Sequence, residues 1–308
     1  MSDSETSVDI TRGTVLITGA TGFLGRALSL YFHQQGYSVR GLARHFEDAF
    51  FSRLRIRLYN CDLPDILDHE AFKNVDVVIH CAYATQKAKS DDAIRINMAG
   101  TEKVYHATRH SGVSQFVFIS SLGANKAAES FYARSKHTIE QTLDPESDLI
   151  LRPGLIIGPG GTFEHIVSNL RRTKVMPIFN GGNQIVQSIY IQDLCAVIEQ
   201  AVRLRLTGVY NAAESQGTEI KRFFGMVARS LGFTCFFLPL PFNPVYGILN
   251  RLERLNIPFP LTTENLLGLI NMRHVDTDRS LKRIGVPVRS FETGIRLYAE
   301  NDTRSATE

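Results

Sequence analysis

The chain has 308 residues, of which 44% are hydrophobic and 21% charged, proportions that are ordinary for a globular enzyme with a full core. Its formal net charge of +3 and its lack of a basic and aromatic stripe exclude nucleic-acid binding from the expected functions. The polar first residues lack the pattern of a signal peptide, and no apolar run is long enough to span a membrane. The four cysteines show no metal-ligand spacing, so we expect a cytoplasmic protein with reduced thiols and no metal site.

The first apolar run, residues 14–18, is followed by three glycines spaced three apart and then by a helical pattern. Gly19 permits a tight turn, Gly22 lets the backbone approach a phosphate, and Gly25 lets the helix pack closely on the strand. Free amides at the start of the helix would face the anion. We therefore predict a dinucleotide site that includes Gly19, Thr21, Gly22, Phe23, Leu24 and Gly25.

Strand and helix patterns alternate after this turn. Strands are predicted at 38–43, 55–60, 75–80, 115–119 and 148–152, and helices at 91–110 and 132–143. This order predicts a doubly wound α/β fold with a parallel sheet covered on both faces. Arg53, Arg55 and Arg57 alternate with apolar residues, which indicates an edge strand with one solvated face.

The alternation stops after Arg152, where glycines and prolines crowd together. We divide the chain into a disordered tail (1–12), a dinucleotide-binding domain (13–153), a mixed region that completes the sheet and forms a substrate-binding lobe (154–300), and a disordered tail (301–308). The apolar run 236–242, with Ile248, Leu249 and Leu252, is interpreted as a lid or core; a partner or membrane-surface patch is the alternative.

Tyr132 and Lys136 lie four residues apart, on one face of a predicted helix that follows a strand and the doublet Ser120-Ser121. Together with the turn T-G-A-T-G-F-L-G, this arrangement resembles the extended and atypical short-chain dehydrogenases/reductases, which include the NAD-dependent epimerases and dehydratases. The resemblance implies a Rossmann-type fold with Ser121, Tyr132 and Lys136 as catalytic residues. Tyr132 would exchange a proton with the substrate oxygen, Lys136 would lower the pKa of Tyr132 and hold the nicotinamide ribose, and Ser121 would fix the substrate oxygen. Ser120 is the competing choice and would otherwise line the cofactor.

Other family motifs follow in order along the chain. N-C-D-L-P resembles the segment that receives the adenine, H-C-A-Y-A the stretch under the cofactor, N-M-A-G-T a helix motif, and R-P-x-x-x-x-G-P-G the signature next to the nicotinamide. Asp193 matches a later motif and is equally well explained as a helix N-cap. The cofactor-binding residues that these matches imply are Asp62, Leu63, Ala82, Tyr83, Ala84, Asn97, Ser120, Tyr132, Lys136 and Pro153.

The end of the second strand determines which nicotinamide is expected. An acid there would bind the ribose hydroxyls of NAD, whereas this chain has Ala43 followed by Arg44. A small residue leaves space, and Arg44 can pair with a 2′-phosphate. We therefore predict NADP(H) in preference to NAD(H).

The predicted function is NAD(P)(H)-dependent hydride transfer at a carbinol or ketone carbon of a nucleotide sugar or a more apolar alcohol. Ser121 and Tyr132 are only eleven positions apart, and Leu122-Gly123-Ala124 replaces the V-Y-G of sugar-modifying members. This departure resembles the atypical branch that contains a complex I accessory subunit, so the alternative is a non-catalytic dinucleotide-binding accessory or redox-sensing protein. The oligomeric state stays open, although the family helices that match Asn97 and Tyr132 often form a homodimer interface.

Overall fold

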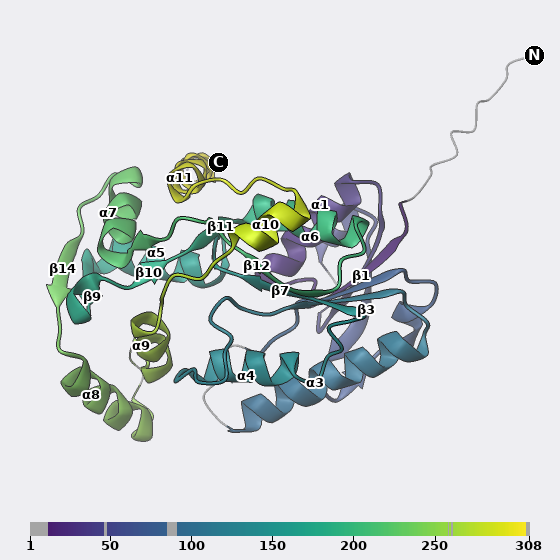
Figure 1. The fold of residues 1–308 in the computed structure, drawn as a ribbon, viewed down its shortest axis with the longest axis horizontal. Coiled ribbons are helices and arrows are strands. Elements are labelled where there is room, and N and C mark those ends of the chain that lie inside the picture. The colour runs from purple at the N-terminus through teal and green to yellow at the C-terminus, as the bar shows by residue number, and fades with distance from the viewer. Residues whose placement is uncertain (1–11, 46–47, 85–90, 258, 260, 306–308) are drawn as a thin grey trace, which may run out of the picture.

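The computed structural model describes residues 12–45, 48–84, 91–257, 259 and 261–305. Its centre is an eight-stranded sheet in the order β12-β7-β6-β5-β1-β2-β3-β4 (Figure 1). The parallel strands are β1 (Thr14–Thr18), β2 (Ser38–Ala43), β3 (Arg57–Asp62), β5 (Val77–His80), β6 (Gln115–Ile119), β7 (Asp148–Pro153) and β12 (Gly208–Ala212). The short β4 (Ile66–Leu67) runs antiparallel to β3. The predicted doubly wound α/β fold is confirmed.

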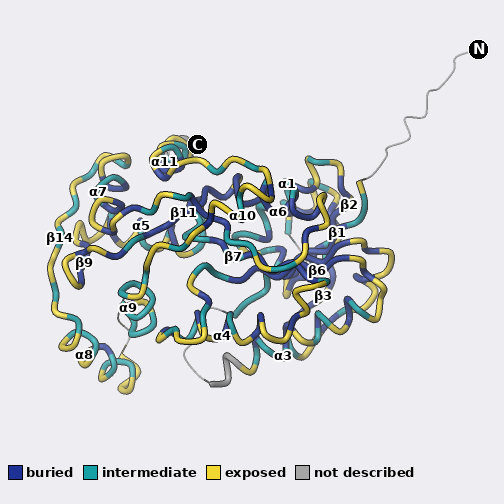
Figure 2. The backbone as a smooth tube through the Cα atoms, viewed as in Figure 1, coloured by how far each residue is buried: buried dark blue, intermediate teal, exposed yellow. Residues whose placement is uncertain are grey.

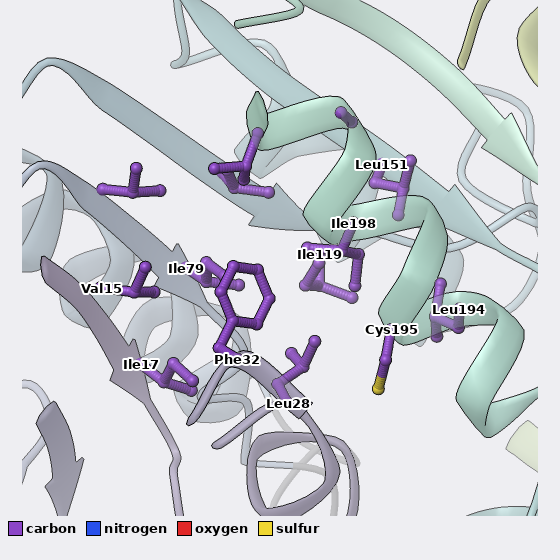
Figure 3. Packing of buried hydrophobic residues seen from close by; sticks show 14 of the residues in the cluster. Val15, Ile17, Leu28, Phe32, Ile79, Ile119, Leu151, Leu194, Cys195 and Ile198 are labelled. Atoms are coloured by element: carbon purple, nitrogen blue, oxygen red, sulfur yellow. The ribbon is translucent and has the colours of Figure 1, made fainter. Parts of the chain in front are cut away.

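Alternate residues of each strand point to opposite faces of the sheet, and each face is covered by helices. Val15 and Ile17 face α1 (Phe23–Gln34) and α6 (Ile191–Arg203), where Phe32 and Cys195 pack over the strands (Figure 3). Leu16 points the other way, into a cluster with residues of α3 (Asp91–His110) and α4 (Phe131–Glu140). The central strands are therefore apolar on both sides, which explains their continuous hydrophobic runs.

The arginine alternation at 53–57 does not form an edge strand. Arg53 ends the short helix α2 (Ala49–Arg53), and Arg55 adopts a left-handed conformation with φ 56°. The helix forms because the Asp48 side chain accepts the Phe50 amide at 2.9 Å and because Phe51 is buried against the core. β3 therefore begins at Arg57, two residues after the predicted start.

The chain after β7 builds a second lobe and returns to the sheet once, as β12 beside β7. Three two-stranded pairs mark the lobe: β8 (Leu155–Ile157) with β11 (Ser188–Tyr190), β9 (Val175–Ile178) with β14 (Phe236–Pro239), and β10 (Ile185–Val186) with β13 (Thr218–Glu219). Its helices are α5 (Gly161–Thr173), α7 (Ile220–Ser230), α8 (Phe242–Arg254) and α9 (Thr263–Ile270), and short 3₁₀ turns occur at His69–Phe72 and Asn180–Gly182. Helix α10 (Asp278–Ile284) then packs beside β12 of the sheet, and α11 (Phe291–Ser305) packs on the lobe against α7 (Figure 1).

Buried carboxylates attach this C-terminal segment. Glu214 accepts the Ser188 and Phe291 amides, at 3.2 and 2.8 Å, and Asp193 accepts the Arg289 amide and pairs with its guanidinium at 2.8 Å. Asp193 thus lies in the first turn of α6 and is not its N-cap.

The C-terminal tail was expected to be disordered from residue 301, but the structure is helical there as far as Ser305. Helix α11 continues to Ser305, because Ile295 and Tyr298 are buried on one of its faces and Asp302 pairs with Arg171 at 2.7 Å. At the other end of the chain, residues 1–11 of the expected tail lie outside the described residues, whereas Arg12 donates its amide to Gly36 and pairs with Glu199. Among the described helices, none has the length and hydropathy that a membrane crossing requires.

Candidate active site

Two of the three glycines in the turn between β1 and α1 are too closely packed for side chains. Gly19 has φ +64°, and a Cβ atom there would lie 2.9 Å from the Cα atom of Ala82. A Cβ at Gly25 would lie 2.2 Å from the Gly19 carbonyl oxygen. Gly22 is exposed and begins α1 with no side-chain cap and no acid in the first turn. The first helical amides therefore face outward beside exposed backbone, an arrangement that suits a phosphate.

Phe23 is packed by the segment that follows β8. Cβ atoms built at Gly158, Gly160 and Gly161 would each lie within 3.1 Å of the Phe23 ring. The G-P-G part of the predicted signature therefore contacts the start of α1, and sequence positions far apart form one wall of the site. Thr21 lies partly buried in the same turn, and Leu24 packs on the core below it.

A buried network joins the ends of β1 and β5. Thr18 Oγ1 accepts the Cys81 and Ala82 amides and lies 2.7 Å from His80 Nδ1, while His80 Nε2 lies 3.1 Å from Thr101 Oγ1. Since Thr18 already accepts two amides, it donates to Nδ1, which assigns the imidazole proton to Nε2. Burial lowers the pKa of His80 to about 3, so the ring is neutral and serves to position the chain.

Asn97 binds the backbone at Ala84 with one side-chain atom, while its other side-chain atom has no partner among the described residues. Its Oδ1 accepts the Ala84 amide at 2.8 Å, and Thr101 donates to its backbone oxygen. Its Nδ2 is buried and has no hydrogen-bond partner in the part of the chain that the structure describes. Asn97 binds Ala84, two residues after Ala82, which contacts the glycine turn. A buried donor without a partner at this place fits a polar ligand such as a dinucleotide.

Ser121 and Tyr132 meet at the end of β6 and the start of α4. Burial raises the pKa of Tyr132, the nearby Tyr83 raises it further, and the Ser121 side chain acts in the opposite direction. The Tyr83 and Tyr132 rings stand edge to face with centroids 5.3 Å apart. Tyr132 is therefore a neutral phenol, the form that can donate a proton.

Lys136 lies one turn further along α4 and is only 4% exposed. Its Nζ donates to the Ile119 carbonyl oxygen at 2.7 Å and lies 4.3 Å from the Tyr83 ring centroid. Burial lowers the pKa of Lys136 to about 7, while the nearby Cys81 and Glu140 side chains act in the opposite direction. Burial thus has the largest effect on the pKa of both Tyr132 and Lys136, and the predicted lowering of the pKa of Tyr132 by Lys136 stays a prediction.

The competing Ser120 is engaged elsewhere. Its hydroxyl donates to the buried Glu140, which also accepts Arg152 Nε at 2.8 Å. The structure thus brings Ser121, Tyr132 and Lys136 close together, whereas the Ser120 side chain is held by Glu140 at the end of α4.

The other predicted cofactor residues surround the end of the sheet. Arg44 and Asp62 are exposed just after β2 and at the end of β3, and Leu63 packs on Gly100 of α3. Pro153 ends β7, where its oxygen accepts the Leu122 amide at 2.9 Å.

Two charged residues of this site were missed in the sequence. Arg26, directly after the glycine turn, pairs with Asp48 at 2.5 Å and lies over the Phe50 ring. Glu264 of α9 accepts the Phe131 and Tyr132 amides at 2.8 and 3.3 Å and so caps the helix that carries Tyr132. Arg26 directly follows the glycine turn, so the sequence could have predicted that it belongs to the site. Nothing local in the sequence connects Glu264 with Tyr132.

Comparison with known proteins identifies the chain's relatives. The model of the NAD dependent epimerase/dehydratase family matches residues 15–213. The chain belongs to this family. The resemblance to short-chain enzymes is thereby confirmed, and the members of this family are NAD(P)-dependent epimerases, dehydratases and reductases, which does not favour the non-catalytic alternative.

Relatives in the family include reductases and a respiratory subunit. The chain is 33% identical over 210 residues to a ceramide reductase of Caulobacter vibrioides, covering 66% of this chain and 65% of that protein. It is 24% identical over 268 residues to a dTDP-4-dehydro-6-deoxy-D-allose reductase of a Streptomyces species, covering 71% and 81%. It is also 25% identical over 291 residues to the mitochondrial NADH dehydrogenase [ubiquinone] 1 alpha subcomplex subunit 9 of Arabidopsis thaliana, covering 85% and 69%.

Solved family structures share the whole fold. A UDP-glucose 4-epimerase of Thermotoga maritima has a TM-score of 0.73 at 18% identity, covering 96% of this chain and all of that one. A human epimerase family protein with NADPH has a TM-score of 0.70 at 17% identity, covering 94% and 99%. These identities bear on the fold alone.

Proposed function

We propose that this family member is a ketone reductase in which Tyr132 is the proton donor. The observation that carries the proposal is the neutral, half-buried Tyr132 phenol beside Ser121, with Lys136 on the same helix face. When bound, the nicotinamide supplies the hydride. Ser121 holds the ketone oxygen, Tyr132 donates the proton that this oxygen gains, and Lys136 holds the cofactor beside them.

We further propose that the cofactor is NADP(H). Ala43 leaves room at the end of β2, and the exposed Arg44 beside it can pair with a 2′-phosphate. The glycine turn and the unpaired Nδ2 of Asn97 provide the remaining polar contacts. The test compares kcat/KM for NADPH and NADH in the wild type and in Arg44→Ala, with the exposed Arg53→Ala as a matched control. An NADH preference in the wild type would overturn the proposal.

For the substrate we favour a long-chain, apolar ketone over a nucleotide-linked ketosugar. Only ten residues separate Ser121 from Tyr132, whereas sugar-modifying enzymes have a longer segment that touches the sugar. A relative named for a lipid substrate, the ceramide reductase, supports the same choice.

The direct test follows deuterium transfer from cofactor labelled at nicotinamide C4 to a panel of long-chain alkyl ketones and nucleotide ketosugars, by mass spectrometry. Label on the former carbonyl carbon of an alkyl ketone supports the proposal. Transfer to ketosugars alone would exclude the apolar substrate, and exchange without net reduction would indicate an epimerase.

We also propose that the protein is cytoplasmic and forms a homodimer through α3 and α4, as the family resemblance suggests. Cell fractionation tests the compartment, and light scattering of the purified chain tests the dimer. A monomer at all concentrations would contradict the second proposal.

A further inference from the structure

The outer face of α8 carries large apolar side chains that contact little of the protein. Ile248 in α8 is 59% exposed and Leu255 at its C-cap is 67% exposed, and beyond the helix Ile257 and Phe259 are 47% and 54% exposed. Ile248 and Leu255 are seven residues apart, so they lie on the same side of the helix with Arg251 between them. We refer to Ile248, Arg251, Leu255, Ile257 and Phe259 as the α8 surface.

Packing of α8 against the protein does not explain these residues. Its inner face is already buried through Leu249, which is 2% exposed and packs with Phe179 and Leu266. Exposed residues recur along α8, which lies at one end of the molecule (Figure 2). Ile248 on the helix and Leu255, Ile257 and Phe259 at and after its end are thus apolar and exposed, although the inner face alone is sufficient to hold α8 on the lobe.

The charges on this helix are arranged unevenly. Arg251 and Arg254 are exposed, whereas its acid, Glu253, is half-buried and accepts the Thr263 amide and hydroxyl at 2.9 and 2.6 Å. The outer face is therefore apolar and basic. A helix with this pattern is typical of one that lies in the interface of an anionic membrane.

We propose that the α8 surface docks the protein onto an anionic lipid surface, with Ile248 and Leu255 entering the acyl boundary and the arginines contacting lipid phosphates. A second copy of the chain fits less well, because a two-fold contact would bring Arg251 and Arg254 toward their own copies without an exposed acid on α8 to pair with them. The proposal does not depend on the hydride-transfer reaction, so either can fail alone.

The test is co-flotation of the full chain with phosphatidylcholine vesicles, with and without phosphatidylglycerol. We expect binding to the anionic vesicles that weakens as salt rises, and little binding to the neutral ones. Ile248→Asp and Leu255→Asp should each lower the partition coefficient about tenfold, and Arg251→Glu about fivefold or more. Leu204→Asp is the matched control, because Leu204 is also exposed, at 45%, but lies outside the α8 surface.

Several outcomes would overturn the proposal. They are no binding to either vesicle, equal binding by the wild type and the Ile248 and Leu255 variants, and equal loss in Leu204→Asp. Self-association that the α8 variants abolish, without vesicle binding, would instead assign the surface to a second copy. Circular dichroism and thermal unfolding establish that each variant is folded.

Discussion

The carboxylate of Glu264 accepts the backbone N–H of Tyr132 at 3.3 Å, and the neighbouring N–H of Phe131 at 2.8 Å. A residue of the C-terminal lobe thereby caps the helix on which the proposed proton donor lies. Negative charge at a helix N-terminus is favourable, and two otherwise unpaired amides gain an acceptor. The lobe and the catalytic helix are thus joined at the site itself.

Removing this cap should disturb Tyr132 more than it disturbs the fold. We expect Glu264→Ala to lower the free energy of unfolding by about 1–2 kcal/mol and to lower kcat more than it changes KM for the cofactor. Glu264→Gln keeps an acceptor and should retain most of the activity. Steady-state kinetics with urea unfolding provide the measurement, and the exposed Glu292→Ala serves as control. Equal kcat in the Ala variant and the wild type would show that the cap does not position Tyr132.

The pKa of Lys136 makes stability depend on pH. Burial lowers this pKa from 10.5 to about 7, so between these values the unfolded chain binds a proton that the folded chain does not. The free energy of unfolding should therefore decrease as pH falls through this window, with a contribution of about 1.4 kcal/mol per pH unit, and this contribution should level off below pH 7. Lys136→Met should remove it. Urea unfolding of both proteins between pH 7 and pH 10 measures the difference, and parallel stability curves would count against the buried lysine.

Gly22 is the glycine of the turn at which a methyl group can be added with least damage to the fold. A Cβ there meets only the Gly19 oxygen, at 3.1 Å, but it projects at the exposed start of α1. Gly22→Ala should weaken NADPH binding by roughly tenfold or more while the protein stays folded, because the backbone must approach the phosphate closely. The change in NADPH fluorescence on binding gives the affinity. The control is Gly247→Ala, where nothing lies within 4 Å of the new atom; unchanged affinity in Gly22→Ala would place the pyrophosphate elsewhere.

The parallel sheet was predictable because both faces of its strands are buried, which leaves continuous apolar runs in the sequence. The meeting of Ser121, Tyr132 and Lys136 was predictable because one strand end and one helix carry all three. The edge strand predicted from the arginines at 53–57 was wrong. Their alternation with apolar residues is typical of a strand, but the Asp48 cap and the burial of Phe51 favour a helix turn. The contact of Glu264 with Tyr132 and that of Asp302 with Arg171 depend on tertiary packing between segments more than a hundred residues apart, and no local pattern encodes them.

In the proposed reaction Tyr132 donates the proton during hydride transfer. The most direct measurement is kcat for NADPH-dependent reduction of a long-chain alkyl ketone by Tyr132→Phe, with the dissociation constant of NADPH determined in parallel and Tyr246→Phe as control. We predict that kcat falls by about 100-fold or more, the usual contribution of a general acid, while NADPH affinity stays within a few-fold of the wild type. Wild-type turnover in Tyr132→Phe would contradict the assignment.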